Sequence, residues 1–291
     1  MNMYRRMIAA LAILLFSWPV TPWAQSEHRE PVTWLILDLP PFFLTKGPDK
    51  GKGLADQIQK MVEGRLDGYR FHRRVANAAR IAKELNGDNR VCFAGEFYGN
   101  PEFLTSAPTI ALLPHTLVVR GQDVQRFGGG KTVRLRRLLQ DPQMVLGTAR
   151  GRLYGPLLDA VLKEYANAEN IYHRAGKDTL EGLLGMLLKG RVDYLIEYPV
   201  SIKYAAKKAG VLDRIETLPI KENSDFPPIR GAIRCPDTPW GRKMIREINQ
   251  ILIELRDLPA YRQIVKNWAV PPGRERQYWE LYEEEILQIK E

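Results

Sequence analysis

Short β-branched runs alternate with amphipathic helical segments along most of the chain, and this alternation constrains the fold more than any other feature of the sequence. Residues 32–38 form an aliphatic run of strand length, and residues 54–66 place leucine, isoleucine, methionine and valine at helical spacing along one face. Residues 69–75 and 90–94 predict two further strands, with a helix over 77–85 between them. Strands that alternate with helices favour a parallel sheet covered by helices.

A second block repeats the alternation of the first. A strand at 114–120 leads into a polar, glycine-rich segment, so we expect the chain to leave the first unit near Gln122. A helical segment then runs directly into a strand at 192–198, and two helices follow within 240–268. The tail at 274–291 carries an aromatic stripe that we expect to pack on the first unit. The two blocks together predict an α/β protein with two lobes.

The amino-terminal segment has the pattern of an export signal. Arg5 and Arg6 precede an uncharged run over 7–16, and Pro22 then comes just before a plausible cleavage point after Ala24. The apolar run is too short to span a bilayer, which needs about 20 residues. We therefore expect residues 1–24 to be a signal peptide and the mature protein to be periplasmic. An uncleaved membrane anchor is the alternative. Pro22 is the third residue before the cleavage point, where a signal peptide favours a small side chain.

The charge balance favours anionic partners without identifying them. The chain carries 43 Lys and Arg against 34 Asp and Glu, a net charge of +9. The basic residues are spread along the sequence and form no single run, so we expect no nucleic-acid partner. A module that binds polyanionic surfaces remains an alternative reading of the charge.

Cysteine and histidine usage argues against a metal site. Cys92 and Cys235 are the only two cysteines, and an exported pair is either one disulfide or two buried free thiols. The four histidines are scattered without metal-ligand spacing. The glycine run at 128–132 has Gln125 where a phosphate-binding loop needs its first glycine. We expect no metal and no cofactor.

The turns that follow strands contain the candidate ligand contacts, because α/β sheets bind ligands at the carboxyl ends of their strands. The turn GTARGRLYG precedes a helix, so its backbone N–H groups and the guanidinium groups of Arg150 and Arg152 could hold an anion. The other expected ligand contacts are Phe42, Phe43, Glu96, Tyr98, Tyr154 and Glu197. The alternatives are a solvated basic turn, core packing of the two phenylalanines and a structural role for Glu197.

The order and spacing of several segments resemble bacterial periplasmic solute-binding proteins of family 3, the amino-acid-binding type. The resembling segments are TWLILDLPPFF, GKGLADQIQKMV, RVCFAGEF, SAP, GTARGRLYG, MLLKGRVDYLIEYP and TPWGRKMIREIN. The resemblance implies a type II fold, in which two crossing segments join two α/β lobes and the solute binds between them. Lobe one would hold residues 25–120 plus 228–291, and lobe two residues 121–227.

The same resemblance implies a function and several residue roles. It implies a monomer without catalytic activity that captures a small polar, anionic or amino-acid-like solute for a membrane importer or a sensor. The family arginine that grips the ligand carboxylate would fall where this chain has Phe103, and the family acid that meets the ligand amine would fall near Glu197. The resemblance also places the strands of Cys92 and Cys235 side by side in lobe one, which implies their disulfide.

A periplasmic enzyme on the same fold is the second functional hypothesis. Some periplasmic dehydratases resemble binding proteins, and in such an enzyme Glu96 or Glu197 would act as general acid or base. Turnover without an added partner would distinguish this enzyme from a binding protein.

Export predicts a mature chain that lacks residues 1–24, because the charged start and the apolar run match a cleavable signal. Intact-mass spectrometry of protein from its native compartment measures this directly. An intact Met1 would exclude a soluble periplasmic protein and favour the uncleaved membrane anchor.

Overall fold

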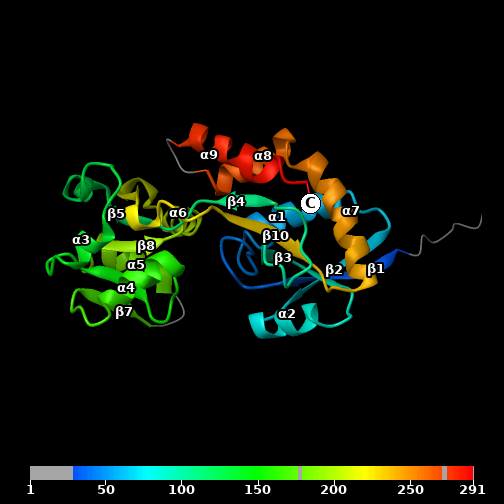
Figure 1. Cartoon of the computed structure of the whole chain (residues 1–291), viewed down its shortest axis with the longest axis horizontal. Helices are drawn as coiled ribbons and strands as arrows, with labels where there is room; N and C mark the ends of the chain where they lie inside the picture. The colour runs from blue at the N-terminus through cyan, green and yellow to red at the C-terminus, as the bar shows by residue number, and fades with distance from the viewer. Residues whose placement is uncertain (1–28, 176–178, 271–273, 291) are drawn as a thin grey trace, which may run out of the picture.

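The computed structural model describes residues 29–175, 179–270 and 274–290, and these form two α/β lobes side by side (Figure 1). The expected signal peptide, residues 1–24, lies outside the described residues. In the part of the chain that is described, no helix combines the length and the apolar character that crossing a bilayer requires.

The first lobe is built on a five-stranded sheet with the order β2-β1-β3-β10-β4. Its strands are β1 (Glu30–Ile36), β2 (Tyr69–Val75), β3 (Val91–Phe97), β4 (Ile110–Leu112) and β10 (Ile229–Arg234). β1 runs parallel to β2 and to β3, whereas β10 runs antiparallel to β3 and to β4. The helices of this lobe are α1 (Leu54–Glu63), α2 (Ala78–Leu85), α7 (Pro239–Leu255), α8 (Pro259–Trp268) and α9 (Glu275–Tyr282), followed by a π-helical turn at Glu283–Leu287.

The aromatic stripe of the tail packs on the first lobe, as expected. Tyr278 and Tyr282 on α9 are buried in the same core as Trp34 of β1. The Tyr278 hydroxyl donates to the carbonyl of Ala111 in β4 at 2.7 Å. The tail therefore covers the sheet of the first lobe.

The second lobe has its own five-stranded sheet with the order β7-β6-β8-β5-β9. Its strands are β5 (Thr116–Arg120), β6 (Leu146–Ala149), β7 (Ile171–Arg174), β8 (Tyr194–Glu197) and β9 (Ile215–Pro219). β6 runs parallel to β7 and β8, and β5 runs antiparallel to β8 and β9. Its helices are α3 (Leu135–Leu139), α4 (Pro156–Glu164), α5 (Thr179–Leu188) and α6 (Pro199–Lys208), with 3-10 turns at Gly121–Phe127 and Leu212–Arg214. A further 3-10 turn, Lys221–Asn223, lies in the segment that leaves the lobe after β9.

Two segments cross between the lobes, the first at residues 113–115 between β4 and β5 and the second at residues 220–228 between β9 and β10. The first crossing differs from the boundary expected after residue 120, because β5 pairs with β8 and β9 in the second sheet. A strand-length run does not reveal which of two sheets it joins, so the sequence pattern assigned β5 to the wrong lobe. We take residues 116–219 as lobe two.

Strand register shows where the crossings attach. In lobe two, Thr116 at the start of β5 lies opposite both Glu197 at the end of β8 and Pro219 at the end of β9. Both crossings therefore meet this lobe at the carboxyl ends of its parallel strands.

The first lobe shows the same arrangement. Ile229 at the start of β10 lies opposite Leu112 at the end of β4, and Gly231 lies opposite Phe97 at the end of β3. Both crossings therefore enter each lobe beside the carboxyl ends of its parallel strands, where an α/β sheet binds ligands.

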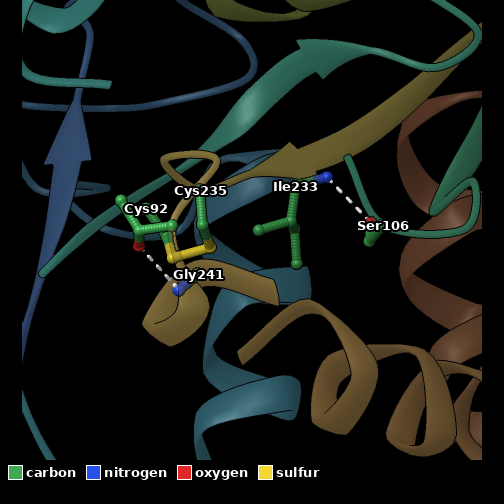
Figure 2. The surroundings of a disulfide bond; sticks show 6 residues. Cys92, Ser106, Ile233, Cys235 and Gly241 are labelled. Atoms are coloured by element: carbon green, nitrogen blue, oxygen red, sulfur yellow. Dashed lines mark hydrogen bonds between the residues drawn. A yellow bond between two sulfur atoms is a disulfide. The ribbon is translucent and has the colours of Figure 1, made fainter. Parts of the chain in front are cut away.

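A disulfide joins β3 to the segment after β10 (Figure 2). Cys92 and Cys235 are 143 residues apart in sequence, and their Cα atoms are 4.4 Å apart. Beside it, the backbone N–H of Ile233 donates to Ser106 Oγ at 3.0 Å (Figure 2), and the N–H of Ser106 donates to the Ile233 carbonyl at 2.7 Å. The late strand is thus fixed to the early part of its lobe by a covalent bond and by hydrogen bonds. This is the pairing that the resemblance implied.

The disulfide predicts that thiol titration of the denatured, unreduced protein finds no free thiol. Because the bond closes a long loop, a Cys92→Ala/Cys235→Ala variant should unfold with a free energy lower by up to about 5 kcal/mol, as measured by urea denaturation. Two titratable thiols in the unreduced wild type would contradict the bond.

Candidate functional site

The turn after β6 and the end of β8 meet beside the crossings, at the carboxyl ends of the parallel strands of lobe two. Arg152, in this turn, donates from Nη2 to Glu197 Oε1, the last residue of β8. The Arg152 side chain is 33% exposed, whereas that of Glu197 is 4% exposed. The two residues form an ion pair between a buried acid and a partly exposed base.

Two glycines shape this turn. Gly151 and Gly155 have φ angles of +74° and +93°, in the region that residues with side chains rarely adopt. The turn is also held by Tyr154, whose N–H donates to Asp159 Oδ1 on α4 at 2.8 Å. The two glycines allow the chain reversal that places Arg152 near Glu197.

The electrostatics of the pair differ from what the sequence suggested. Burial raises the pKa of Glu197, while the charge of Arg152 and the N–H of Tyr198, which donates to Oε1 at 2.9 Å, lower it. The absence of acids near Arg152 in sequence indicated an uncompensated cation, but the fold supplies Glu197 from a strand 45 residues away. Arg150 is exposed and has no ion pair among the described residues, so it is the less compensated of the two arginines.

His115, in the first crossing, completes this cluster. Its ring stacks on Tyr198 with centroids 3.6 Å apart and meets Tyr154 edge-on at 5.3 Å. Asn223, in the second crossing, donates from Nδ2 to the carbonyl of His115 at 3.1 Å. Both crossings therefore contact each other and the polar residues of lobe two. We call Arg152, Tyr154, Glu197, Tyr198, His115 and Asn223 the hinge cluster.

The titratable groups of the hinge cluster are held in their neutral forms, apart from the ion pair. Burial, with the nearby charge of Arg152, lowers the pKa of His115 to about 3. Burial raises the pKa of Tyr154 and of Tyr198 to about 12. At neutral pH the cluster therefore presents a neutral imidazole and two neutral phenols around one ion pair.

The aromatic residues expected to line lobe one are mostly in its core. Phe43 is fully buried and stacks on Phe93 with centroids 5.6 Å apart. Phe42 is half-buried and packs against the same core. The alternative that these phenylalanines pack in the core therefore applies to Phe43.

Glu96 and Tyr98 contact residues of their own lobe. Glu96 Oε2 accepts a hydrogen bond from Arg234 of β10 at 3.3 Å. The Tyr98 ring lies 4.9 Å from the guanidinium of Arg230, which in turn pairs with Glu285 near the carboxyl end of the chain. Their contacts hold them to β10 and to the tail of their own lobe.

An apolar edge on lobe one was missed by the sequence reading. Leu39, Val75 and Phe97 are 44%, 59% and 59% exposed, and they lie at or just beyond the ends of β1, β2 and β3. These strands are adjacent and parallel, so their ends share one edge of the sheet. In lobe two, Leu153 in the turn after β6 is 78% exposed. The sequence signal that could have identified this apolar edge is the presence of large apolar residues at the ends of predicted strands.

Comparison with solved protein structures identifies the fold of this chain. No protein-family model matches the sequence, and no curated protein matches it. The chain is similar to a Streptococcus mutans structure from work on glutathione import via GshT and the cystine ABC importer TcyBC, with a TM-score of 0.59 and 20% identity over 84% of this chain and 99% of that one.

Two further solved structures share the arrangement. MxaJ from Methlophaga aminisulfidivorans has a TM-score of 0.60 and 12% identity, covering 82% of this chain and 99% of its own. A substrate-binding protein of a polar amino acid ABC uptake transporter from Streptococcus thermophilus has a TM-score of 0.57 and 16% identity, covering 89% and 94%. The bilobal α/β fold of these structures is therefore the fold of this chain.

Burial of His115 predicts a specific pH dependence of stability. Below its ordinary pKa of about 6.5 the unfolded chain binds a proton that the folded chain, with a pKa of about 3, does not bind, so stability falls as the pH drops from 6.5 toward 3. Between pH 7 and pH 5 the wild type should lose about 2 kcal/mol more unfolding free energy than His115→Gln. Urea denaturation at both pH values measures the difference.

His72, exposed on β2, provides the matched control, because His72→Gln should follow the pH dependence of the wild type. Parallel pH profiles for the wild type and His115→Gln would contradict the burial of a neutral imidazole.

Proposed function

We propose that this chain, which has the type II periplasmic-binding fold, is a periplasmic solute-binding protein that captures a small polar solute between its lobes. The hinge cluster carries the proposal. It brings an ion pair, a neutral imidazole and two phenols to the carboxyl ends of parallel strands, where α/β sheets bind ligands. The disulfide is consistent with an oxidising, extracytoplasmic compartment.

The ion pair favours an amino-acid-like head group over a simple anion. A carboxylate that bound Arg152 alone would separate it from Glu197 and leave a buried acid without its partner, which is costly. A solute with both a carboxylate and an amine can compensate both residues at once. Arg150, exposed in the same turn, would add a second contact to the carboxylate.

The apolar edge of lobe one suits the remainder of such a solute. Leu39, Val75 and Phe97 offer apolar surface on one side of the cleft, and Leu153 offers it on the other. Closure of the lobes about the two crossings would bury this surface together with an apolar part of the solute.

Binding without turnover is the function that these contacts support better than catalysis. Both carboxylates of the enzyme hypothesis, Glu96 and Glu197, are engaged in ion pairs with arginines, Arg234 and Arg152 respectively. We propose that the loaded protein delivers its solute to a membrane importer or a sensor, as one structural neighbour is named a substrate-binding protein of an ABC uptake transporter.

A thermal-shift screen of the mature protein tests the proposal. The probes are the standard amino acids, glutathione, cystine, succinate and inorganic phosphate. A probe present at 100 times its dissociation constant should raise the unfolding free energy by about 2.7 kcal/mol. A complete absence of shifts would count against solute binding, and conversion of a bound probe, seen by mass spectrometry, would favour the enzyme.

Loss of the Arg152 guanidinium should weaken binding of the solute found in that screen. Arg152→Ala removes a charge-assisted contact worth about 1.5 to 3 kcal/mol, which corresponds to a loss of affinity of roughly 10- to 150-fold. Arg137→Ala is the control, because Arg137 is exposed on α3 outside the turn. Calorimetry that gave equal affinities for wild type and Arg152→Ala would show that the turn is only a solvated loop.

A further inference from the structure

A pocket of about 650 Å³ lies between the two lobes, and we call it the β9 pocket. Lobe two lines it with β9 and the start of α6, and lobe one lines it with Trp268 and the residues that follow α8. The lobes touch beside it, because Lys203 Nζ on α6 donates to the carbonyl of Val270 at 3.2 Å. Among the described residues that line it, none belongs to the hinge cluster. Its volume lies in the range of small-molecule sites, about 300 to 1,000 Å³, so it can hold a ligand of its own.

One wall of the β9 pocket is an unpaired strand edge. β9 is the last strand of its sheet, with β5 on one side. On the other side the carbonyl of Pro219 accepts from the N–H of Val133 at 2.8 Å, so this carbonyl points away from β5. Because hydrogen-bonding directions alternate along an antiparallel strand, the N–H and C=O of Thr217 point the same way.

Thr217 lines the β9 pocket and forms no backbone hydrogen bond on that side with any residue that the structure describes. The pocket therefore offers the N–H and the C=O of a strand edge. An extended peptide recognises this pair of groups, because it can add to the edge as a further strand.

Two cations from different lobes line the β9 pocket without an acidic partner. Lys203 and Arg274 are both partly buried, and neither forms an ion pair with a described residue. Burial, with the nearby charge of Lys207, lowers the pKa of Lys203, while Glu275 acts in the opposite direction. Removing a cation from water without a counter-charge is costly, so a carboxylate in the pocket would stabilise both side chains.

Two acids also line the β9 pocket, on the side of lobe two. Asp213 and Glu216 are exposed, and neither forms an ion pair within the described part of the chain. They repel a second carboxylate and attract an amine. Leu212, which is 37% exposed, and Trp268 add apolar surface. The charged residues together match a ligand with one carboxylate and one ammonium group.

We propose that the β9 pocket binds a short extended peptide with free ends, at a site separate from the solute site of the proposed function. The peptide carboxylate binds Lys203 and Arg274, and the peptide backbone pairs with Thr217. The amino group lies toward Asp213 and Glu216. A single amino acid has no peptide bond to pair with the strand edge, so the site selects peptides over free amino acids.

Calorimetry with tripeptides tests the ligand class. The probes are tri-L-alanine and L-alanyl-L-leucyl-L-alanine, each also with an amidated carboxyl end, and succinate as an anion without amide groups. At least one free tripeptide should bind, and amidation should weaken it by about tenfold or more, because the charge-assisted contacts to Lys203 and Arg274 are lost. Absence of binding by both free tripeptides, equal affinity of an amidated form, or equal affinity of succinate would each overturn the inference.

Thr217→Pro tests the strand edge, because proline lacks the N–H that the peptide would bind. Edge strands tolerate proline where the N–H faces away from the sheet. The tripeptide should lose about fivefold in affinity, whereas Thr217→Val, which keeps the N–H, should bind it as the wild type does. Equal affinities for both variants would contradict pairing at this edge.

Lys203→Gln tests the carboxylate contact and also decides the matter if Thr217→Pro does not fold. This variant should weaken the tripeptide by about tenfold or more. Lys207→Gln is the matched control, because Lys207 is exposed one turn further along α6 and does not line the β9 pocket. Unchanged affinity in Lys203→Gln would overturn the inference.

Arg152→Ala separates the β9 pocket from the hinge cluster. Tripeptide affinity should survive this change, because Arg152 does not line the β9 pocket. A tripeptide that is weakened by Arg152→Ala but not by Lys203→Gln would be bound at the hinge cluster, which supports the proposed function and overturns this inference. Tripeptide binding that depends on Lys203, with no other solute bound in the thermal-shift screen, would leave this inference standing while the proposed function failed.

Discussion

The antiparallel pairing of β5 with β8 sets Thr116 opposite Glu197, and the arrangement of the cleft depends on that register. One step further along, the same register brings His115 opposite Tyr198, and their rings stack at 3.6 Å. A slip of one residue would exchange the faces of the strand and remove both contacts. The pairing thus fixes the first crossing against the strand end that carries the buried acid.

The fold could be predicted from the sequence because the local spacing of apolar residues determines which segments form strands and helices. The alternation of strands and helices, and the order of the segments, predicted two α/β lobes. The same pattern selected Arg152, Tyr154 and Glu197, which the structure brings together, because each follows or ends a predicted strand. His115 and Asn223, which contact these residues, were not selected because they lie on crossings, where neither periodicity nor a motif marks a position. The partner of Arg152 was missed for a related reason, since charges close in sequence do not report charges close in space.

Side-chain alternation separates two neighbouring residues at the end of β3 in lobe one. Neighbouring residues on a strand point to opposite faces, so Glu96 and Phe97 lie on opposite sides of the sheet, and Phe97 is the exposed one. Where the resembling family would supply an arginine, the ring of Phe103 lies 3.5 Å from the guanidinium of Arg234. The guanidinium of Arg234 is buried and hydrogen-bonded to Glu96, so it is not accessible to the carboxylate of a ligand.

The polar residues that the structure gathers beside the carboxyl ends of parallel strands therefore lie in lobe two and on the crossings, around the ion pair of Arg152 and Glu197. Removing the arginine from such a buried acid without replacing its charge is costly, because the acid would then be buried without a partner. His115 stacks on Tyr198 next to Glu197, and Asn223 donates to the carbonyl of His115, so the two crossings and the end of β8 form one contact network. The position of the ion pair therefore depends on both crossings as well as on the sheet of lobe two.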